Sequence, residues 1–483
     1  MIDLPPDLQL LIARLAEAFR RESGEAELFL VGGLVRDVLL GAPVGRDLDF
    51  ATNVLPARTE RALSAAGGKV FKIGEKFGTI GSIFDTTLVE VTTYRAEAYQ
   101  AGSRKPEVKF GHGRSLLDDL ARRDFTINAI AFDPRSGAIQ DPFGGQDDLR
   151  NGVIRAVGAP AERFSEDPLR LLRAVRFASR LGFAIEPETA EAIRDAAPAL
   201  GTISRERVRD ELEKLLLGPA PSQGIRMLCD LHLADFSLPD VPKLRGMHQE
   251  VAQGRHKDVF NHTLQVLDRT PPRLALRWAA LLHDIAKPLT KRVENGKVTF
   301  HGHDQKGQRM ATRTLTELHQ PAELVDRVGR LVGLHLRANA YEGEWTDSAV
   351  RRFVREVGDE LIEDLLALSR ADVTTGRVER RTAIARSVAE LERRIQTLRA
   401  QEDIANLSSP LDGLDLMRLF ERGPGPWIKP IKDHLTELVI EGELAQADKD
   451  AATPIARRLY AELKLGDVAE MTGRQRRPPD TLG

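Results

Sequence analysis

Two aspartates, Asp47 and Asp49, stand one residue apart in the stretch R-D-L-D-F. Side chains two residues apart on a β-strand point to the same face, so a strand here brings both carboxylates to one point in space. Two close carboxylates repel each other unless a cation lies between them, and their hard oxygen atoms suit Mg²⁺. The pair therefore predicts a magnesium site. The alternative is a D-x-D on a solvated surface.

A glycine pair precedes these aspartates in G-G-L-V-R-D-V-L-L. Gly32 and Gly33 leave the backbone bare at the start of a short helix, where phosphate oxygens can approach the N–H groups. Arg36 lies one helical turn further on and can reach a phosphate. Together with the aspartates, this arrangement predicts a site that holds two metal ions and a triphosphate for in-line nucleotidyl transfer. The alternative is a glycine pair that only caps a helix.

A third carboxylate would complete that metal site. Glu90 is the best candidate, because it interrupts T-L-V-E-V-T-T-Y, a strand otherwise suited to burial. A salt-bridged strand glutamate explains the same pattern equally well. Asp85 is a weaker candidate.

Further polar residues accompany the apolar, strand-like run in R-R-D-F-T-I-N-A-I-A-F. Arg123, Asp124 and Asn128 need hydrogen-bonding partners there, and a nucleotide ribose with its 2′-hydroxyl would supply them. We therefore expect these three residues to bind the sugar of a nucleotide.

The stretch E-D-P-L-R-L-L-R-A-V-R begins a helix near its proline and repeats a charged residue every three positions. Asp167, Arg170, Arg173 and Arg176 form a polar stripe opposite an apolar face. Asp167 can accept a hydrogen bond from the exocyclic amine of cytosine or adenine, while Arg170 donates to the adjacent ring nitrogen. Uracil and guanine would leave both side chains unpaired, at roughly 1–3 kcal/mol for each buried group. We expect this pair to read the base; a solvated basic face is the simpler alternative.

Histidines and aspartates gather in the second half of the chain. His283 and Asp284 are adjacent in A-L-L-H-D-I-A-K-P, on an apolar helix. Four more metal-ligating residues stand on neighbouring segments: His262, His303, His335 and Asp372. A single histidine on an apolar face is usually a core residue, but the whole set predicts a divalent metal site with nitrogen and oxygen ligands.

The composition limits the class of protein. The 483 residues are too many for one hydrophobic core and predict two to four domains. The one cysteine, Cys229, excludes a disulfide framework and fits a reducing cytosol, so we expect a cytoplasmic protein. No stretch has the length of a membrane span, and the amphipathic helix expected at the start is not a signal peptide. With a net charge of -2, nucleic acid must bind through local basic patches.

The elements that must position these residues change along the chain. Residues 26 to about 150 alternate short apolar runs with turn signals, which predicts strands with a few short helices between them. From about residue 160 onward the period is helical almost throughout. The pattern predicts a small α/β head followed by a long helical remainder.

In this order and spacing, the motifs resemble the class II tRNA nucleotidyltransferases and bacterial poly(A) polymerases of the DNA polymerase β superfamily. G-G-L-V-R-D with D-L-D is similar to the family's catalytic motif, R-R-D-F-T-I-N-A to its ribose-binding motif, and E-D-P-L-R-L-L-R to its amino-acid template for CTP and ATP. D-P-F-G-G, at 141–145, is similar to its hinge motif, and the resemblance covers about residues 26–220 tightly. The second half resembles an HD domain, a metal-dependent phosphohydrolase, with His262, His283, Asp284 and Asp372 at the ligand positions.

The resemblance implies an α+β fold, with a polymerase β-like head of mixed sheet and helices before an all-α neck, body and tail. The expected domains are the head at 1–150, a base-reading neck at 151–220, an HD-containing body at 221–400, a tRNA-binding tail at 401–470 and a disordered end at 471–483. It implies template-independent addition of the 3′-terminal CCA to tRNA from CTP and ATP, with Mg²⁺ at Asp47 and Asp49. His303 and His335 would suit a second HD metal, and Mn²⁺ or Ni²⁺ would suit the HD site. An HD fold kept only for shape or RNA contact is the alternative.

Several alternatives stay open at this point. The segment 95–106 reads as a full-length mobile loop, and family members that add only CC look loop-deleted there, so we expect addition of at least the terminal A. An enzyme that adds only A fits equally. A poly(A) polymerase fits less well, because the pI is about 6.6 and the His-Asp set is present. A phosphohydrolase with a nucleotide-binding head and a pure RNA-binding module are more distant rivals.

Pro424 and Pro426 predict a rigid turn before Trp427, either for RNA contact or as a core corner. The oligomeric state stays open.

Overall fold

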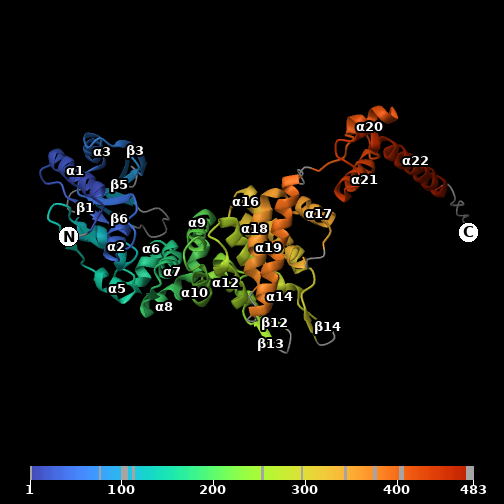
Figure 1. Ribbon diagram of the computed structural model, residues 1–483. Helices are drawn as coiled ribbons and strands as arrows, with labels where there is room; N and C mark the ends of the chain where they lie inside the picture. The colour runs from blue at the N-terminus through green and yellow to red at the C-terminus, as the bar shows by residue number, and fades with distance from the viewer. Residues whose placement is uncertain are drawn as a thin grey trace, which may run out of the picture.

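The computed structural model of the chain describes residues 3–74, 78–98, 107–110, 115–251, 255–294, 297–341, 345–373, 378–401 and 407–474. The molecule is elongated, and the chain passes from a head with the main sheet through a helical neck and body to a tail (Figure 1). Within these ranges no helix is both long and apolar enough to cross a membrane. The mixed head before a mainly helical remainder confirms the predicted fold class.

A seven-stranded mixed sheet forms the centre of the head. Its strands, in spatial order, are β3 (Lys69–Gly74), β4 (Thr79–Phe84), β5 (Thr87–Thr93), β2 (Asp47–Thr52), β1 (Leu28–Val31), β8 (Ala131–Phe132) and β9 (Ile139–Gln140). β2 pairs with β5 in parallel, and the other neighbours are antiparallel. Leu48 and Phe50 on β2 are buried, whereas the alternating Asp47 and Asp49 are exposed. The strand that the aspartate spacing predicted is confirmed.

Two helices pack on one face of this sheet. α1 (Pro6–Glu22) lies against α3 (Pro56–Ala65), and α3 contacts β3, β4 and β5. The predicted apolar stripe of α1 is buried in full: Leu8, Leu11, Ile12, Leu15 and Phe19. The head also contains α2 (Gly33–Leu39), α4 (Leu116–Ala121), α5 (Gly145–Asn151) and a hairpin of β6 (Arg95–Ala98) with β7 (Glu107–Phe110). The expected loop at 95–106 therefore begins with a strand, and residues 99–106 lie outside the described residues.

The predicted neck, residues 151–220, contains α6 (Pro160–Glu166), α7 (Leu169–Leu181), α8 (Pro187–Ala196) and α9 (Arg205–Leu216). Two further helices follow it, α10 (Pro221–Asp230) and α11 (Ala234–Ser237). α7 contacts both α9 and α10, and its apolar face is buried as the sequence predicted. A two-stranded parallel pair, β10 (Val153–Ile154) and β11 (Ala184–Ile185), joins head and neck.

The body is helical apart from two small hairpins. Its helices are α12 (Val259–Arg269), α13 (Leu274–Leu282), α14 (Lys287–Thr290), α15 (His303–Glu317), α16 (Ala322–Leu334), α17 (Asp347–Val357), α18 (Asp359–Asp372) and α19 (Val378–Gln401). The hairpins pair β12 (His248–Val251) with β13 (Arg255–Asp258), and β14 (Arg292–Glu294) with β15 (Lys297–Thr299). The sequence did not reveal these strands, because such short and charged segments carry no alternating apolar pattern.

The tail contains α20 (Gly413–Phe420), α21 (Ile428–Glu441) and α22 (Lys449–Arg474). Trp427 packs against Phe420 and Tyr460, and its indole N–H donates to the backbone oxygen of Gly423. Trp427 is buried, whereas Pro424 and Pro426 of the preceding turn are exposed, so both alternatives for the turn stay open. α22 continues to Arg474, which includes the first residues of the end expected to be disordered from residue 471. Residues 475–483 lie outside the described residues.

Candidate active site and metal centre

Three carboxylates of the head lie on neighbouring strands. Asp47 and Asp49 alternate along β2, and Glu90 on β5 is the direct parallel neighbour of Asp49. The strand residues between them are buried, so the three carboxylates share the opposite face. Asp85, the weaker candidate, occupies the turn between β4 and β5 with a φ of 51°, a conformation that short polar side chains tolerate. Glu90 is therefore the third carboxylate that the fold places beside Asp49.

The environment of Asp49 favours a bound cation. Burial and the negative charge of Glu90 raise the pKa of Asp49 to about 6, against the lowering effect of Arg123, and Asp47 raises it further. Water still reaches the side chain, because the strand face is open. A divalent cation would relieve the repulsion between these carboxylates. Hard oxygen donors in an open corner fit Mg²⁺, the predicted metal.

The glycine turn lies directly against this corner. Gly32 has a φ of 78°, and a Cβ there would lie 3.3 Å from Arg123 Nη1 and 3.6 Å from Asp49 Oδ2. Both the backbone conformation and the limited space therefore favour glycine. α2 begins at Gly33, so its first N–H groups follow the turn without intrahelical acceptors. The turn can present these donors to phosphate oxygens next to the carboxylates.

Arg36 is buried rather than exposed to a ligand. It is only 3% exposed, and its guanidinium donates to Asn128 Oδ1 at 2.8 Å and to Asp37 Oδ1 at 2.8 Å. The same group lies over the ring of Phe177, and a Cβ on Gly33 would lie 3.5 Å from Arg36 Nη2. In this arrangement Arg36 packs against the glycine turn from the protein interior. The sequence placed a cation one turn after the glycines but could not show that the fold would enclose it.

Arg123 lies near Gly32 and Asp49, on the segment between α4 and β8. It donates to the buried carboxylate of Asp119 at 3.1 Å and approaches Gly32. Its Nε atom is buried without a hydrogen-bond partner among the described residues. A buried N–H group without a partner is costly, so this atom fits a ligand oxygen. Asp119 was not singled out in the sequence, where nothing distinguishes it from a surface carboxylate.

Asp124 and Asn128 lie close together, but on a loop and a 3-10 turn (Thr126–Asn128) rather than on the expected strand. Asp124 accepts hydrogen bonds from Asn128 Nδ2 at 3.0 Å and from Arg173 Nε at 2.8 Å. Although burial opposes this, the Arg173 guanidinium and the hydrogen bond from Asn128 hold the pKa of Asp124 below its usual range. Asp124 is thus bound to protein partners that connect the head with α7.

The side chains of Asp167 and Arg170 contact separate protein partners and not each other, and their joint reading of a base stays a prediction. Asp167 precedes α7 in an extended conformation, with a φ of -145°, and the helical spacing rule does not apply to it. Its Oδ2 atom accepts instead from Arg207 Nη2 of α9 at 2.8 Å. Arg170 donates to Glu166 Oε2 at 2.7 Å and to the backbone oxygen of Arg122 at 2.7 Å.

Arg173 and Arg176 form internal ion pairs instead of a solvated stripe. Arg176 donates to Glu211 Oε2 at 2.6 Å, and Arg173 reaches both Asp124 and Glu211. Both guanidinium groups lie over the ring of Phe177. Burial lowers the pKa of Arg176, against the effect of Glu211. These contacts hold α7 against the head and against α9.

The predicted histidines and aspartates of the body come together in one cluster, in which all but the half-buried Asp372 are buried. They lie on α12 (His262), at the end of α13 (His283, Asp284), at the start of α15 (His303), at the end of α16 (His335) and at the end of α18 (Asp372). His262 Nε2 lies 3.2 Å from His283 Nε2 and 2.8 Å from Asp372 Oδ1. Asp284 Oδ2 lies 3.2 Å from His283 Nε2, and Asp284 Oδ1 lies 3.5 Å from His303 Nε2. This convergence of residues from distant segments is what a metal site requires.

Backbone carbonyls orient three of these histidines. Each Nδ1 contacts the carbonyl oxygen three residues earlier: His283 to Ala280 at 2.8 Å, His303 to Phe300 at 2.8 Å and His335 to Val332 at 2.6 Å. A histidine that donates from Nδ1 presents the lone pair of Nε2 to a metal. Nitrogen lone pairs and carboxylates that face one another call for a cation, so the donor set fits a divalent transition metal.

The pKa shifts differ among the histidines of the cluster. Burial lowers the pKa of His262 to about 4 and that of His335 to about 4, so both rings are neutral ligands at pH 7. Against the effect of burial, the charge of Asp284 raises the pKa of His283. Burial also opposes ionisation of Asp284, but His283 and Lys287 hold the pKa of Asp284 well below its usual range.

Asp284 joins two possible metal positions. Among the described residues, the groups whose ligand atoms all lie within 4.8 Å of one another are His262 with His283 and Asp284, and Asp284 with His303 and His335. Lys287 Nζ contacts Asp284 Oδ2 at 2.7 Å and was not singled out, although it stands one helical turn later in H-D-I-A-K. The carboxylates of the head are spread more widely than either group.

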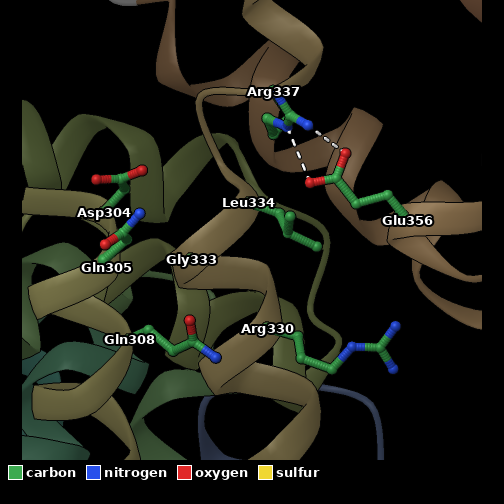
Figure 2. Close-up of a pocket in the computed structure, with 8 residues that line it drawn as sticks. All are labelled: Asp304, Gln305, Gln308, Arg330, Gly333, Leu334, Arg337 and Glu356. Carbon is green, nitrogen blue, oxygen red and sulfur yellow. Dashed lines mark hydrogen bonds and ion pairs between the residues drawn. The ribbon is translucent and has the colours of Figure 1, made fainter. Parts of the chain in front are cut away.

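A polar pocket of about 520 Å³ is lined mainly by residues of α15 and α16 (Figure 2). Its lining includes Gln308 of α15 and Arg337, which pairs with Glu356. Gln308 stands five residues after His303, which places it about 140° around the helix from that ligand. None of the candidate metal ligands is among the residues that line the pocket.

Three family models match successive parts of the chain. The Poly A polymerase head domain matches residues 28–155, the probable RNA and SrmB-binding site of polymerase A matches 182–244, and the HD domain matches 259–376. Their order follows the head, neck and body of the structure.

Two curated relatives span most of the chain. The A-adding tRNA nucleotidyltransferase of Deinococcus radiodurans is 37% identical over 429 residues, which cover 86% of this chain and 92% of that protein. The CCA-adding enzyme of Geobacillus kaustophilus is 32% identical over 421 residues, which cover 86% of this chain and 90% of that protein. Among solved structures, the CCA-adding enzyme of Bacillus stearothermophilus in complex with CTP matches with a TM-score of 0.68 at 29% identity, covering 96% of this chain and 100% of that chain.

Proposed function

Because this chain belongs to the family of tRNA nucleotidyltransferases that includes the A-adding and CCA-adding enzymes, we propose that it adds the 3′-terminal CCA, and at least its final A, to tRNA. The substrates would be ATP and CTP, and diphosphate would be released. The observation that carries the proposal is that Asp49, with Glu90 beside it on β5, lies against the turn at Gly32, where the guanidinium of Arg123 also lies.

In the proposed reaction, the 3′-hydroxyl of the RNA attacks the α-phosphorus of the nucleotide in line. A new O–P bond forms, the bond to the diphosphate breaks, and the hydroxyl proton passes to solvent. Asp47 and Asp49, with Glu90, would hold Mg²⁺. When bound there, this metal supplies activation of the hydroxyl and stabilises the leaving diphosphate.

The protein's own groups would bind and orient the nucleotide. The first N–H groups of α2 and Arg123 would contact the phosphates and ribose, since the Arg123 Nε atom is buried without a protein partner among the described residues. Arg36, Asp124 and Asn128 would support the nucleotide site indirectly, because their hydrogen bonds are made to one another and to α7. Asp167 and Arg170 would read the exocyclic amine and the adjacent ring nitrogen.

The test is nucleotide addition to three tRNA transcripts that end at the discriminator base, at CC and at CCA. Each transcript receives CTP, ATP or both. Growth from the discriminator base to CCA, followed by arrest, is the expected result for a complete CCA-adding enzyme. Addition only to the CC end would mean an A-adding enzyme, a reading that the Deinococcus relative favours. Long A tails on any RNA would contradict both in favour of a poly(A) polymerase.

For the body, we propose a metal-dependent phosphohydrolase or phosphodiesterase. The support is the buried cluster around Asp284, in which each oriented histidine presents Nε2 to its neighbours. The substrate class is a phosphate ester, either a cyclic phosphate, a phosphorylated RNA end or a nucleotide. The test is release of phosphate or ring opening with each of these compounds, with the protein loaded with Mn²⁺ or Ni²⁺. No turnover of any of them with either metal would contradict the proposal.

A further inference from the structure

Asp167, which reads the amine of the base in the proposed function, is held by a residue from another helix. Its Oδ2 atom accepts from Arg207 Nη2 of α9 at 2.8 Å, and its Oδ1 atom accepts the backbone N–H of Leu169 at 3.1 Å. The terminal torsion of an aspartate is soft, so a single hydrogen bond leaves the carboxylate plane free to rotate. Two hydrogen bonds from different directions fix both oxygens.

The same face of α9 makes a second contact with α7, one helical turn further along. Glu211, one helical turn after Arg207, accepts from Arg176 Nε at 2.6 Å and lies 3.9 Å from Arg173 Nη1. Glu211 is buried, whereas the Arg207 side chain is 50% exposed and the Asp167 side chain is 31% exposed. The contact between Arg207 and Asp167 therefore lies at the open edge of the neck, where a nucleotide base can reach the carboxylate.

We propose that Arg207 is a positioning residue for base selection, which fixes the Asp167 carboxylate so that its lone pairs face an exocyclic amine. This inference rests on the proposed role of Asp167. A carboxylate oxygen carries two lone pairs, so Oδ2 can accept from Arg207 and from the amine of cytosine or adenine at the same time. Uracil and guanine present a carbonyl oxygen at that place, which a fixed carboxylate cannot satisfy. Without Arg207 the carboxylate keeps one hydrogen bond, turns away from the base and discriminates less.

The experiment compares Arg207→Ala and Arg207→Lys with the unchanged protein and with Arg205→Ala. Arg205 is on the same helix, but it donates to the backbone oxygen of Phe236, away from Asp167. For each protein, kcat and KM are measured with CTP, UTP, ATP and GTP on the matching tRNA end. If the enzyme adds only A, the ratio of ATP to GTP suffices.

The expected result for Arg207→Ala is a loss of about tenfold in the preference for CTP over UTP and for ATP over GTP, the size of one charge-assisted hydrogen bond. The loss should appear mainly as a higher KM for CTP and ATP, with kcat nearly unchanged. Arg207→Lys should recover part of the preference, and Arg205→Ala should keep it.

Other outcomes would overturn the inference. Unchanged nucleotide preference in Arg207→Ala would show that the ion pair has no role in selection. A lower KM for CTP and ATP would show that Arg207 competes with the base instead of positioning its reader. Asp167→Ala, measured in parallel, distinguishes failure of this inference from failure of the proposed base reading. If Asp167→Ala loses selectivity and Arg207→Ala does not, only this inference fails; if Asp167→Ala also keeps it, the proposed base reading fails as well.

Discussion

Asp47 and Asp49 stand on an open strand face, whereas His283 and Asp284 in the body are 0% and 1% exposed. The head supplies carboxylates from two strands and leaves space beside them, so nucleotide and RNA can enter and complete the coordination of a metal. The body encloses its ligands and orients three histidines through backbone carbonyls before any substrate arrives. The head is therefore expected to bind metal together with its nucleotide, and the body to bind metal by itself.

The largest expected effect separates the two sites completely. Asp47→Ala should reduce nucleotide addition by about a thousandfold or more, since removing one preorganised electrostatic group typically costs 10²–10³ in rate. Hydrolysis by the HD site should be unchanged, and His283→Ala should produce the opposite pattern. Asp85→Asn, in the turn between β4 and β5, serves as the control and should keep both activities, because asparagine tolerates the positive φ there. Loss of both activities in either variant would contradict two independent sites.

Metal retention tests the difference in enclosure. After dialysis without chelator, the purified protein should retain a transition metal in the body and lose Mg²⁺ from the head, as measured by plasma mass spectrometry. Asp284→Asn should release the retained metal, because Asp284 belongs to both ligand groups. His335→Ala should weaken only one position, by about 10–100-fold in affinity, if ligands there contribute as supporting residues do elsewhere. A metal content in Asp284→Asn equal to that of the unchanged protein would contradict this arrangement.

The stability of the head should depend on the ion pair between the buried Asp124 and Arg173 of α7. Asp124→Asn should lower the free energy of unfolding by about 2 kcal/mol at pH 7, because it removes the charged partner of Arg173. The pKa of Asp124 is depressed from its ordinary value of 3.8, so its stabilisation is present above that value and is lost as the pH falls through the folded-state pKa. Denaturant titrations at several pH values should show the difference shrinking below about pH 4. Asp147→Asn, in an exposed Asp–Arg pair, should change stability little at any pH. An equal effect of both substitutions would contradict the role of burial.

The smallest expected effect is the destabilisation of the fold by repulsion among Asp47, Asp49 and Glu90. The pKa of Asp49 is raised to about 6, so the folded protein binds this proton more strongly than the unfolded chain does. Stability without metal should therefore fall as the pH rises from about 4 to 6, and Asp49→Asn should remove that loss. The gain at pH 8 should be about 1 kcal/mol or less, because water screens the repulsion. Thermal unfolding in EDTA measures it, and a gain of equal size at pH 4 would contradict an electrostatic origin.

Local patterns predicted much of the fold and singled out the candidate ligands that the structure brings together in the head and in the body. The alternation of Asp47, Leu48 and Asp49 identified a strand with one open face, and the spacing of Leu8, Leu15 and Phe19 identified the buried side of α1. These features depend only on the period of each element and on side-chain chemistry. Short charged strands such as β12 and β14 have no such period, so the sequence did not reveal them.

The sequence by itself determined which residues can hold metal and phosphate, because carboxylates, imidazoles and glycines carry that chemistry wherever they stand. Only the tertiary structure decided which charged residues face a ligand and which face each other. Arg36 meets Asn128, 92 positions away, and Asp167 meets Arg207, 40 positions away. Such pairs form where distant segments pack together, and burial requires each charge to find a partner. The packing of α7 and α9 thus gives Arg173, Arg176 and Arg207 partners within the protein, whereas Arg123 Nε has none among the described residues.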